Sequence, residues 1–189
     1  MTEPAPYPQE LTRDVALKNG TRVHIRPIRA ADAAQLVAAY ERLSAHSAYQ
    51  RFFSMMRRLP PDWARFLATV DYQRRMALVA ERPDDDELLG VARYEPSDDG
   101  TPEVAFVVLD AWQNQGLGTL LFHALLEAAS ARGFGRFRAH VLADNVRMLD
   151  LISRFGDVQH RRRDGAVIEL VFTLPSPLAP PPAREGPPD

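Results

Sequence analysis

Residues 103–133 constrain the fold more than any other part of the chain. The stretch opens with an apolar run rich in valine and phenylalanine, EVAFVVL, which is typical of a strand buried on both faces. It closes with apolar residues at helical spacing and with Gly133, placed where a helix C-cap is expected. Between the two lies a turn with glycines at 116 and 118. The stretch therefore predicts a strand that passes through a short turn directly into a helix.

The junction between this strand and helix has the features of an anion-binding site. The first N–H groups of a helix have no partner within it, and the helix dipole makes that end positive. Gly116 and Gly118 let the backbone approach a phosphate or pyrophosphate closely. On its own, a Gly-x-Gly pair favours a plain connection that binds nothing. The sequence has no P-loop, and Leu121 stands where G-x-G-x-x-G would have its third glycine.

Composition excludes several classes of protein. A length of 189 residues and a hydrophobic fraction of 46% fit one domain with a good core. The net charge of -2 gives no bulk attraction to nucleic acid or membrane. There is no cysteine, so disulfides and a thiol nucleophile are excluded. The five histidines have no metal-binding spacing, and neither a membrane span nor a signal peptide is visible. We expect a cytoplasmic protein without a metal.

Hydrophobic periodicity and turn residues divide the chain into alternating elements. We expect a flexible tail at 1–10, one domain at 11–174 and a disordered proline-rich tail at 175–189. A hairpin is predicted around Asn19-Gly20, and a short amphipathic helix at 44–53 should pack its aromatic residues inward. Further strands are expected at 76–81, 88–94, 136–142, 158–163 and 167–174, and further helices at 30–45, 62–69 and 146–154.

The turn resembles the acyl-CoA-binding motif Q/R-x-x-G-x-G/A of the GNAT acetyltransferases. The resemblance implies that acetyl-CoA is the co-substrate and that backbone N–H groups of the turn hold its pyrophosphate. In that family the residue before the first glycine is often Arg or Lys, whereas here it is Gln115, so weaker binding is expected. The residues that carry the motif are Gln113, Asn114, Gln115, Gly116, Leu117, Gly118 and Thr119.

Other stretches are similar to one GNAT branch, the bacterial protein lysine acetyltransferases of the Pat family. They read IRPI at 25–28, SAYQRFF at 47–53, DYQRRMALVA at 71–80, GVARY at 90–94 and VLADNVRML at 141–149. The resemblance covers 15–174 and implies an α/β (α+β) GNAT fold, a mixed, mostly antiparallel twisted sheet flanked by helices. Pat proteins often carry a second, regulatory domain, for which this chain has no room, so we expect no such regulation.

Transfer of an acetyl group to lysine requires a base. A lysine amine has a reference pKa near 10.4, so it is mostly protonated at neutral pH and not nucleophilic. A carboxylate can remove the proton if burial raises its pKa, or if it acts through a water. Glu103 is the candidate because Pat-type enzymes place their general base at this position; without that resemblance it reads as a rim glutamate. The other carboxylates considered, Glu81, Glu87 and Glu95, read as surface groups at strand ends.

The resemblance assigns further roles along the substrate path. Backbone groups of Val107, Val108 and Leu109 would face the thioester and pantetheine where the strand separates from its neighbour. Asn145 reads as a helix N-cap, and the resemblance adds a pantetheine contact. Many GNAT enzymes protonate the leaving thiolate with a tyrosine, but Ile152 holds that position here, and Tyr49 and Tyr72 remain alternatives without support.

Three functions are compatible with the sequence. The first is acetyl-CoA-dependent acetylation of a lysine in a protein, with an acyl-CoA synthetase as the expected acceptor. The second is acetylation of a small amine, which a deep acidic pocket would favour over a broad groove. The third is a non-catalytic module that senses acyl-CoA. The oligomeric state is left open.

Overall fold

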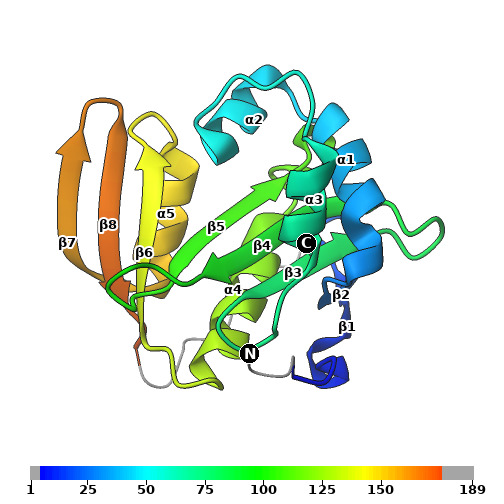
Figure 1. The fold of residues 1–189 in the computed structure, drawn as a ribbon, viewed down its shortest axis with the longest axis horizontal. Coiled ribbons are helices and arrows are strands. Elements are labelled where there is room, and N and C mark those ends of the chain that lie inside the picture. The colour runs from blue at the N-terminus through cyan, green and yellow to red at the C-terminus, as the bar shows by residue number, and fades with distance from the viewer. Residues whose placement is uncertain (1–4, 176–189) are drawn as a thin grey trace, which may run out of the picture.

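The computed structural model describes residues 5–175, which form one eight-stranded sheet with helices on both faces (Figure 1). The strand order is β1-β2-β3-β4-β5-β6-β8-β7, and every neighbouring pair is antiparallel except β5 and β6. The expected mixed, mostly antiparallel sheet is confirmed. The strands are β1 (Arg13–Ala16), β2 (Arg22–Pro27), β3 (Met76–Glu81), β4 (Leu88–Glu95), β5 (Glu103–Val108), β6 (Arg136–Leu142), β7 (Asp157–Asp164) and β8 (Val167–Thr173).

The helices divide between the two faces of the sheet. The described α-helices are α1 (Ala33–Glu41), α2 (Ala45–Phe52), α3 (Pro61–Ala68), α4 (Leu117–Ser130) and α5 (Val146–Phe155), with short 3-10 turns at Gln9–Leu11, Ala30–Asp32 and Asp110–Trp112. Helices α4 and α5 share the larger hydrophobic core with one face, and the Phe122 and Phe155 rings lie 6.2 Å apart there. Helices α1, α2 and α3 cover the other face of β3 and β4.

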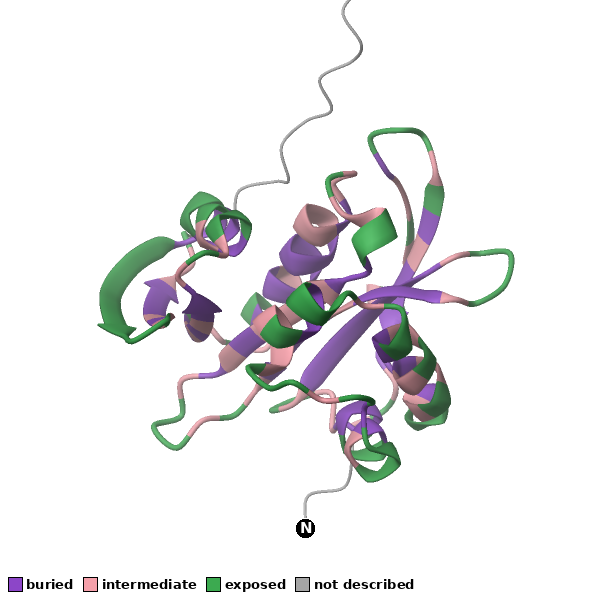
Figure 2. Cartoon of the chain, turned by 90° about the horizontal axis from the view of Figure 1, so that it is seen from above, coloured by how far each residue is buried: buried purple, intermediate pink, exposed green. Residues whose placement is uncertain are grey.

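The distribution of burial follows these layers. The central strands and α4 carry most of the buried residues, whereas β7, at the edge of the sheet, is exposed along its whole length (Figure 2). The described residues contain no helix that is both long and apolar enough to cross a membrane.

Local sequence signals fix several element boundaries. The hairpin between β1 and β2 turns at Asn19-Gly20, where Gly20 has a φ of +84° that glycine adopts without strain. Asn145 caps α5, because its side chain accepts a hydrogen bond from the Met148 N–H at 3.2 Å. Both features were predicted. Gly133 is not the C-cap of α4, since that residue is Ala131.

Strand β5 differs from its prediction. The apolar run suggested burial on both faces, but only Val104 and Val108 are buried in this strand. These two side chains face α4 in the core, whereas Ala105 and Val107 line an open cleft on the other side of β5. An apolar face that lines a cleft has the same sequence pattern as a face that packs against protein. The prediction of burial on both faces was wrong for this reason.

Two further expectations need correction. In α2, Phe52 packs between the Tyr40 and Trp63 rings, but Tyr49 and Phe53 are 38% and 37% exposed instead of packing inward. Near the N-terminus, the Tyr7 hydroxyl donates a hydrogen bond to the Pro27 carbonyl at 3.0 Å. Residues 7–10 are therefore attached to the domain rather than part of a loose tail. Apart from Pro175, the expected C-terminal tail lies outside the described residues, as do residues 1–4.

A buried ion cluster ties β2 to β3. The Arg26 guanidinium lies 2.8 Å from the Asp32 carboxylate and 2.7 Å from the Glu81 carboxylate, and all three side chains are less than one-tenth exposed. Glu81 is therefore not the surface group that the sequence suggested. A buried charge that loses its partner is strongly destabilising, because it cannot recover the water it gave up.

We therefore expect Arg26→Met to destabilise the domain by about 3–5 kcal/mol, since it leaves two buried carboxylates without their cation. Urea unfolding followed by circular dichroism measures the loss. Arg22→Met is the matched control, because Arg22 lies on the same strand and is exposed. Equal stabilities of the two variants would contradict a structural role for the cluster.

Candidate functional site

A large cleft lies where β5 and β6 separate. These two strands form a single register pair, Glu103 with Arg138, and β6 then pairs only with β8. The strands diverge beyond this point (Figure 1). The cleft between them has a volume of about 1700 Å³, above the roughly 300–1,000 Å³ of ordinary small-molecule pockets. Its walls come from the β1–β2 hairpin, α2, β5, the turn before α4, β6 and α5.

The Gly-x-Gly turn forms one end of the cleft. Asn114 and Gly116 have φ values of +63° and +88°, which Asn tolerates and Gly adopts freely. A Cβ on Gly118 would lie 3.4 Å from the Phe106 ring, in van der Waals contact, so the start of α4 packs closely on β5. No side chain in the described part of the chain caps the first turn of α4. Its unpaired N–H groups therefore remain available to a ligand in the cleft.

The two glutamine side chains of the turn, Gln113 and Gln115, bind different parts of the fold. The Gln113 side chain donates hydrogen bonds to the Val108 carbonyl at 3.0 Å and to the Ser47 hydroxyl at 3.2 Å, and it accepts one from Arg147 at 3.1 Å. Gln113 thus joins β5, α2 and α5 around the cleft. The Gln115 side chain accepts a hydrogen bond from Asn19 at 2.9 Å and holds the β1–β2 hairpin against the turn.

This hairpin brings Lys18 to the turn. The Lys18 N–H donates a hydrogen bond to the Gln115 carbonyl at 3.2 Å, and its side chain runs within about 3.5 Å of where a Gly116 Cβ would lie. Lys18 and Arg147 both line the cleft, so two cations lie beside the turn although Gln115 itself is neutral. No local sequence pattern indicates either contribution, since both depend on tertiary contacts.

Glu103 lies at the other end of the cleft, where β5 and β6 meet. Its carboxylate is 3.2 Å from Nδ1 of His140 on β6, and its side chain is 41% exposed. His140 follows Arg138, the register partner of Glu103, by two residues, so it projects from the same face of the sheet. The sequence pattern does not reveal His140 as a partner of Glu103, because the spacing of the histidines bears only on metal binding.

The backbone of β5 divides its N–H groups between β4 and the cleft. The Leu109 N–H donates to the Leu89 carbonyl at 2.9 Å, so it faces β4. Because successive residues in a strand alternate in direction, Val107 also faces β4, and the N–H groups of Phe106 and Val108 face the cleft. Of the three residues expected to present donors to a thioester, only Val108 has an N–H with the required direction.

The other candidate residues are placed as follows. Asn145, which caps α5, lines the cleft. Ile152 is fully buried in the core and cannot reach a ligand. The Tyr72 hydroxyl is bonded to the Ile28 carbonyl at 2.9 Å, and neither Tyr72 nor Tyr49 lines the cleft. Among the described lining residues there is no tyrosine to protonate a leaving thiolate.

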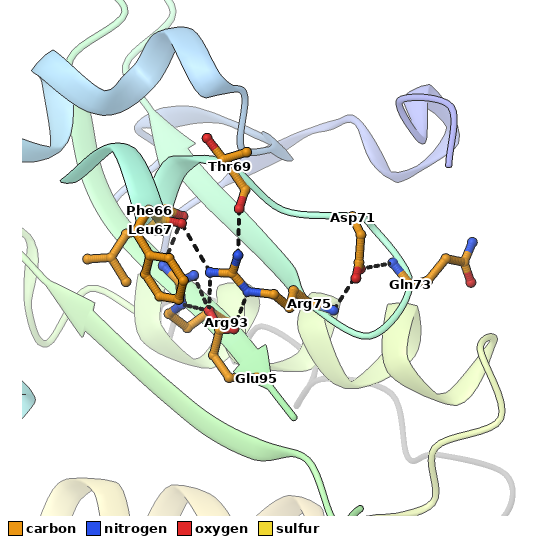
Figure 3. Close-up of polar contacts among 8 residues, drawn as sticks. All are labelled: Phe66, Leu67, Thr69, Asp71, Gln73, Arg75, Arg93 and Glu95. Carbon is orange, nitrogen blue, oxygen red and sulfur yellow. Dashed lines mark hydrogen bonds and ion pairs between the residues drawn. The ribbon is translucent and has the colours of Figure 1, made fainter. Parts of the chain in front are cut away.

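The alternative carboxylates are already paired with arginines. Glu95 binds Arg75 and Arg93, as Figure 3 shows. Burial raises the pKa of the Glu95 carboxyl, but the hydrogen bond from Arg75 and the charges of both arginines outweigh it and hold the pKa below its usual value. Glu87 pairs with Arg42 and Arg82. Glu103 is the glutamate among the described residues that lines the cleft.

Asp110 fixes α2 as a wall of the cleft. Its carboxylate accepts hydrogen bonds from the Ser44 N–H at 2.9 Å and from the hydroxyls of Ser44 and Ser47 at 2.8 Å each. Burial raises the pKa of Asp110, but these hydrogen bonds outweigh burial and hold the pKa below its usual value. Asp110 is therefore a carboxylate at neutral pH. The first turn of α2 is therefore attached to the segment that follows β5.

The fold is that of an acetyltransferase, as comparison with known proteins shows. The chain belongs to the acetyltransferase (GNAT) family, whose model matches residues 34–157. It is 32% identical over 152 residues to acetyltransferase PA5475 of Pseudomonas aeruginosa, covering 79% of this chain and 82% of that protein. GNAT acetyltransferases use acetyl-CoA as the acetyl donor.

Two further relatives support the resemblance to the Pat branch. The chain is 30% identical over 168 residues to acetyltransferase Pat of Mycolicibacterium smegmatis, which covers 88% of this chain but only 50% of that protein. The crystal structure of the GNAT domain of S. lividans PAT aligns with a TM-score of 0.81 and 31% identity, covering 89% of this chain and all of that domain. The chain thus spans about half of one Pat protein and the whole GNAT domain of another.

If the turn holds the phosphates of acetyl-CoA, Lys18→Met should weaken acetyl-CoA binding about tenfold, because it removes a charge-assisted contact. Isothermal titration calorimetry with acetyl-CoA measures the affinity of both proteins. A higher salt concentration should reduce the difference in affinity between the wild type and Lys18→Met, because salt screens the charge. Arg22→Met, in the same hairpin but away from the cleft, serves as the control. Unchanged affinity in Lys18→Met would show that Lys18 does not contact the phosphates.

Proposed function

We propose that this protein transfers the acetyl group of acetyl-CoA to the side-chain amine of a lysine in another protein. The arrangement that carries the proposal is the forked cleft, with the Gly-x-Gly turn at one end and Glu103 at the other. The similarity to two Pat proteins supports a protein acceptor. The match to the GNAT domain of S. lividans PAT extends over the whole of that domain, which is consistent with the proposal.

Glu103 is proposed to act as the general base. The protonated acceptor amine approaches Glu103 and loses a proton to it, and the free amine attacks the thioester carbonyl with formation of a C–N bond. The C–S bond then breaks, CoA leaves as the thiolate, and the second proton lost by the nitrogen passes to that thiolate through water. Because the Glu103 side chain is 41% exposed, water reaches it, and we propose that the proton is transferred through a water. His140, 3.2 Å away, orients the carboxylate. The cleft-facing N–H of Val108 is the proposed donor to the developing oxyanion.

The shape of the cleft bears on the acceptor. A small amine would be expected to bind in a deep acidic pocket, but the lining here mixes carboxylates with the cations Lys18, Arg51, Arg147 and Arg154, and the cleft is open. An open groove suits a lysine on the surface of a folded protein. By analogy with Pat we propose an acyl-CoA synthetase as the acceptor and the cytoplasm as the setting.

The proposal is tested by transfer of radiolabelled acetyl from acetyl-CoA to a purified acyl-CoA synthetase. We expect labelling by Glu103→Gln to be at least about tenfold slower than by the wild type, because loss of a general base costs roughly 10²–10⁴-fold. Calorimetry should find acetyl-CoA binding unchanged. Glu41→Gln, at an exposed glutamate on α1, is the matched control and should label like the wild type.

Other results would point to the rival functions. Acetylation of small amines but of no protein would show that the acceptor is a small amine rather than a protein lysine. Binding of acetyl-CoA without transfer to either class, unaffected by Glu103→Gln, would favour a non-catalytic acyl-CoA sensor. Full transfer activity in Glu103→Gln would show that Glu103 is not the general base, although the protein would still be an acetyltransferase.

A further inference from the structure

Three arginines near helices α1, α2 and α3 differ in burial and in their partners: Arg26 and Arg93 are buried, whereas Arg51 is half-buried. Arg26 is held by Asp32 and Glu81, and Arg93 by Glu95 and the Leu67 carbonyl (Figure 3). The guanidinium of Arg51, in the last turn of α2, has no hydrogen bond or ion pair with any residue in the described range 5–175. Its guanidinium packs over the Phe52 ring, 4.8 Å from the ring centroid.

Arg51 lies where two cavities meet. It lines the large cleft, and it also lines a small, mostly apolar pocket of about 50 Å³ beneath α1 and α2. Val107 of β5 and Phe52 line both cavities as well. The guanidinium therefore lies at the side of the cleft formed by α2, across from the wall that α5 and the Gly-x-Gly turn provide.

The carboxylates nearest in charge to Arg51 have other partners. Burial lowers the pKa of its guanidinium to about 10, and the positive charge of Arg93 acts in the same direction. It remains protonated at neutral pH. Glu103 and Glu95 attract it, but Glu95 is engaged by two other arginines and Glu103 lies beside His140. A partly desolvated cation without a carboxylate is costly, so its presence calls for an explanation.

The end of α2 carries a second unusual feature. Phe53, the residue after Phe52, has a φ of +52°, a left-handed conformation that is uncommon for a bulky side chain. It lines the cleft and is 37% exposed. Phe53 is the C-cap of α2, and this left-handed residue ends the helix at the edge of the cleft. Asp110 holds the other end of α2, so Arg51 and Phe53 are presented from a fixed helix.

We propose that Arg51 binds a carboxylate carried by one of the two substrates that meet at Glu103. The inference rests on the proposed transferase function and adds a substrate class to it. A guanidinium offers a planar pair of donors that matches a carboxylate, and the low-dielectric wall strengthens the contact. The carboxylate belongs either to an acidic residue near the acceptor lysine or to the far end of a dicarboxylic acyl group.

Two pairs of substrates distinguish these sources. In the first, capped peptides with lysine flanked by Glu are compared with peptides flanked by Gln, using acetyl-CoA. In the second, the Gln-flanked peptide is compared with acetyl-CoA and with succinyl-CoA. We expect the wild type to prefer the carboxylate in one pair by about tenfold in kcat/KM, as for one charge-assisted contact. Arg51→Gln should lose that preference, and Arg58→Gln, at an exposed arginine outside the cleft, should keep it.

A readout without turnover separates this inference from the proposed function. Calorimetry measures binding of both peptides, and of acetyl-CoA and succinyl-CoA, to the same three proteins. A carboxylate preference in binding that Arg51→Gln abolishes would support the inference even if no acetyl group is transferred, in which case the proposed function alone fails. Absence of a preference in both turnover and binding overturns the inference, whatever the activity.

A stability measurement tests the alternative of a structural role. Because Arg51 has no carboxylate partner among residues 5–175, and methionine can keep an apolar contact with the Phe52 ring, Arg51→Met should unfold at the same or a higher temperature than the wild type. A clear fall in the unfolding midpoint would show that Arg51 stabilises the fold and would overturn the inference. An equal fall in kcat with all substrates would also overturn it, because that pattern indicates a role in the common chemical step.

Discussion

The separation of β5 from β6 is the constraint on which the site depends. A sheet normally continues its hydrogen bonds along neighbouring strands, because an unpaired N–H or C=O that is cut off from water is costly. Here β5 and β6 share one register pair, and beyond it β6 pairs with β8 alone. The cleft-facing side of β5 is thereby left without a neighbouring strand. The fork creates both the space for a ligand and the backbone donors that can meet it.

Side chains from distant segments compensate for this open fork. The Gln113 side chain donates a hydrogen bond to the Val108 carbonyl and also forms hydrogen bonds with Ser47 on α2 and Arg147 on α5. Asp110 attaches the start of α2 to the same segment. The two sides of the cleft are therefore connected mainly through the residues that follow β5. A substitution in this short segment would alter the width of the whole cleft rather than one contact.

The sequence predicts the parts of the site that are local and misses those that are not. The Gly-x-Gly turn, the hairpin at Asn19-Gly20 and the Asn145 cap all depend on neighbouring residues, and their signals are visible along the chain. The pairing of Glu103 with His140 depends on the register between strands that a helix separates, so no local pattern reveals it. Similarly, Glu81 looks like a strand-end surface residue until Arg26 is seen beside it.

The position of Lys18 has a consequence for the chemistry of the protein's own surface. It is the single lysine of the sequence, in which Lys and Arg together number 23. Arginine stays protonated at physiological pH and offers no free amine. The chain therefore presents one lysine amine to any acetyl donor, and that amine lies beside the Gly-x-Gly turn. Acetylation of this residue would erase a positive charge at the turn and would appear as one mass shift at one position.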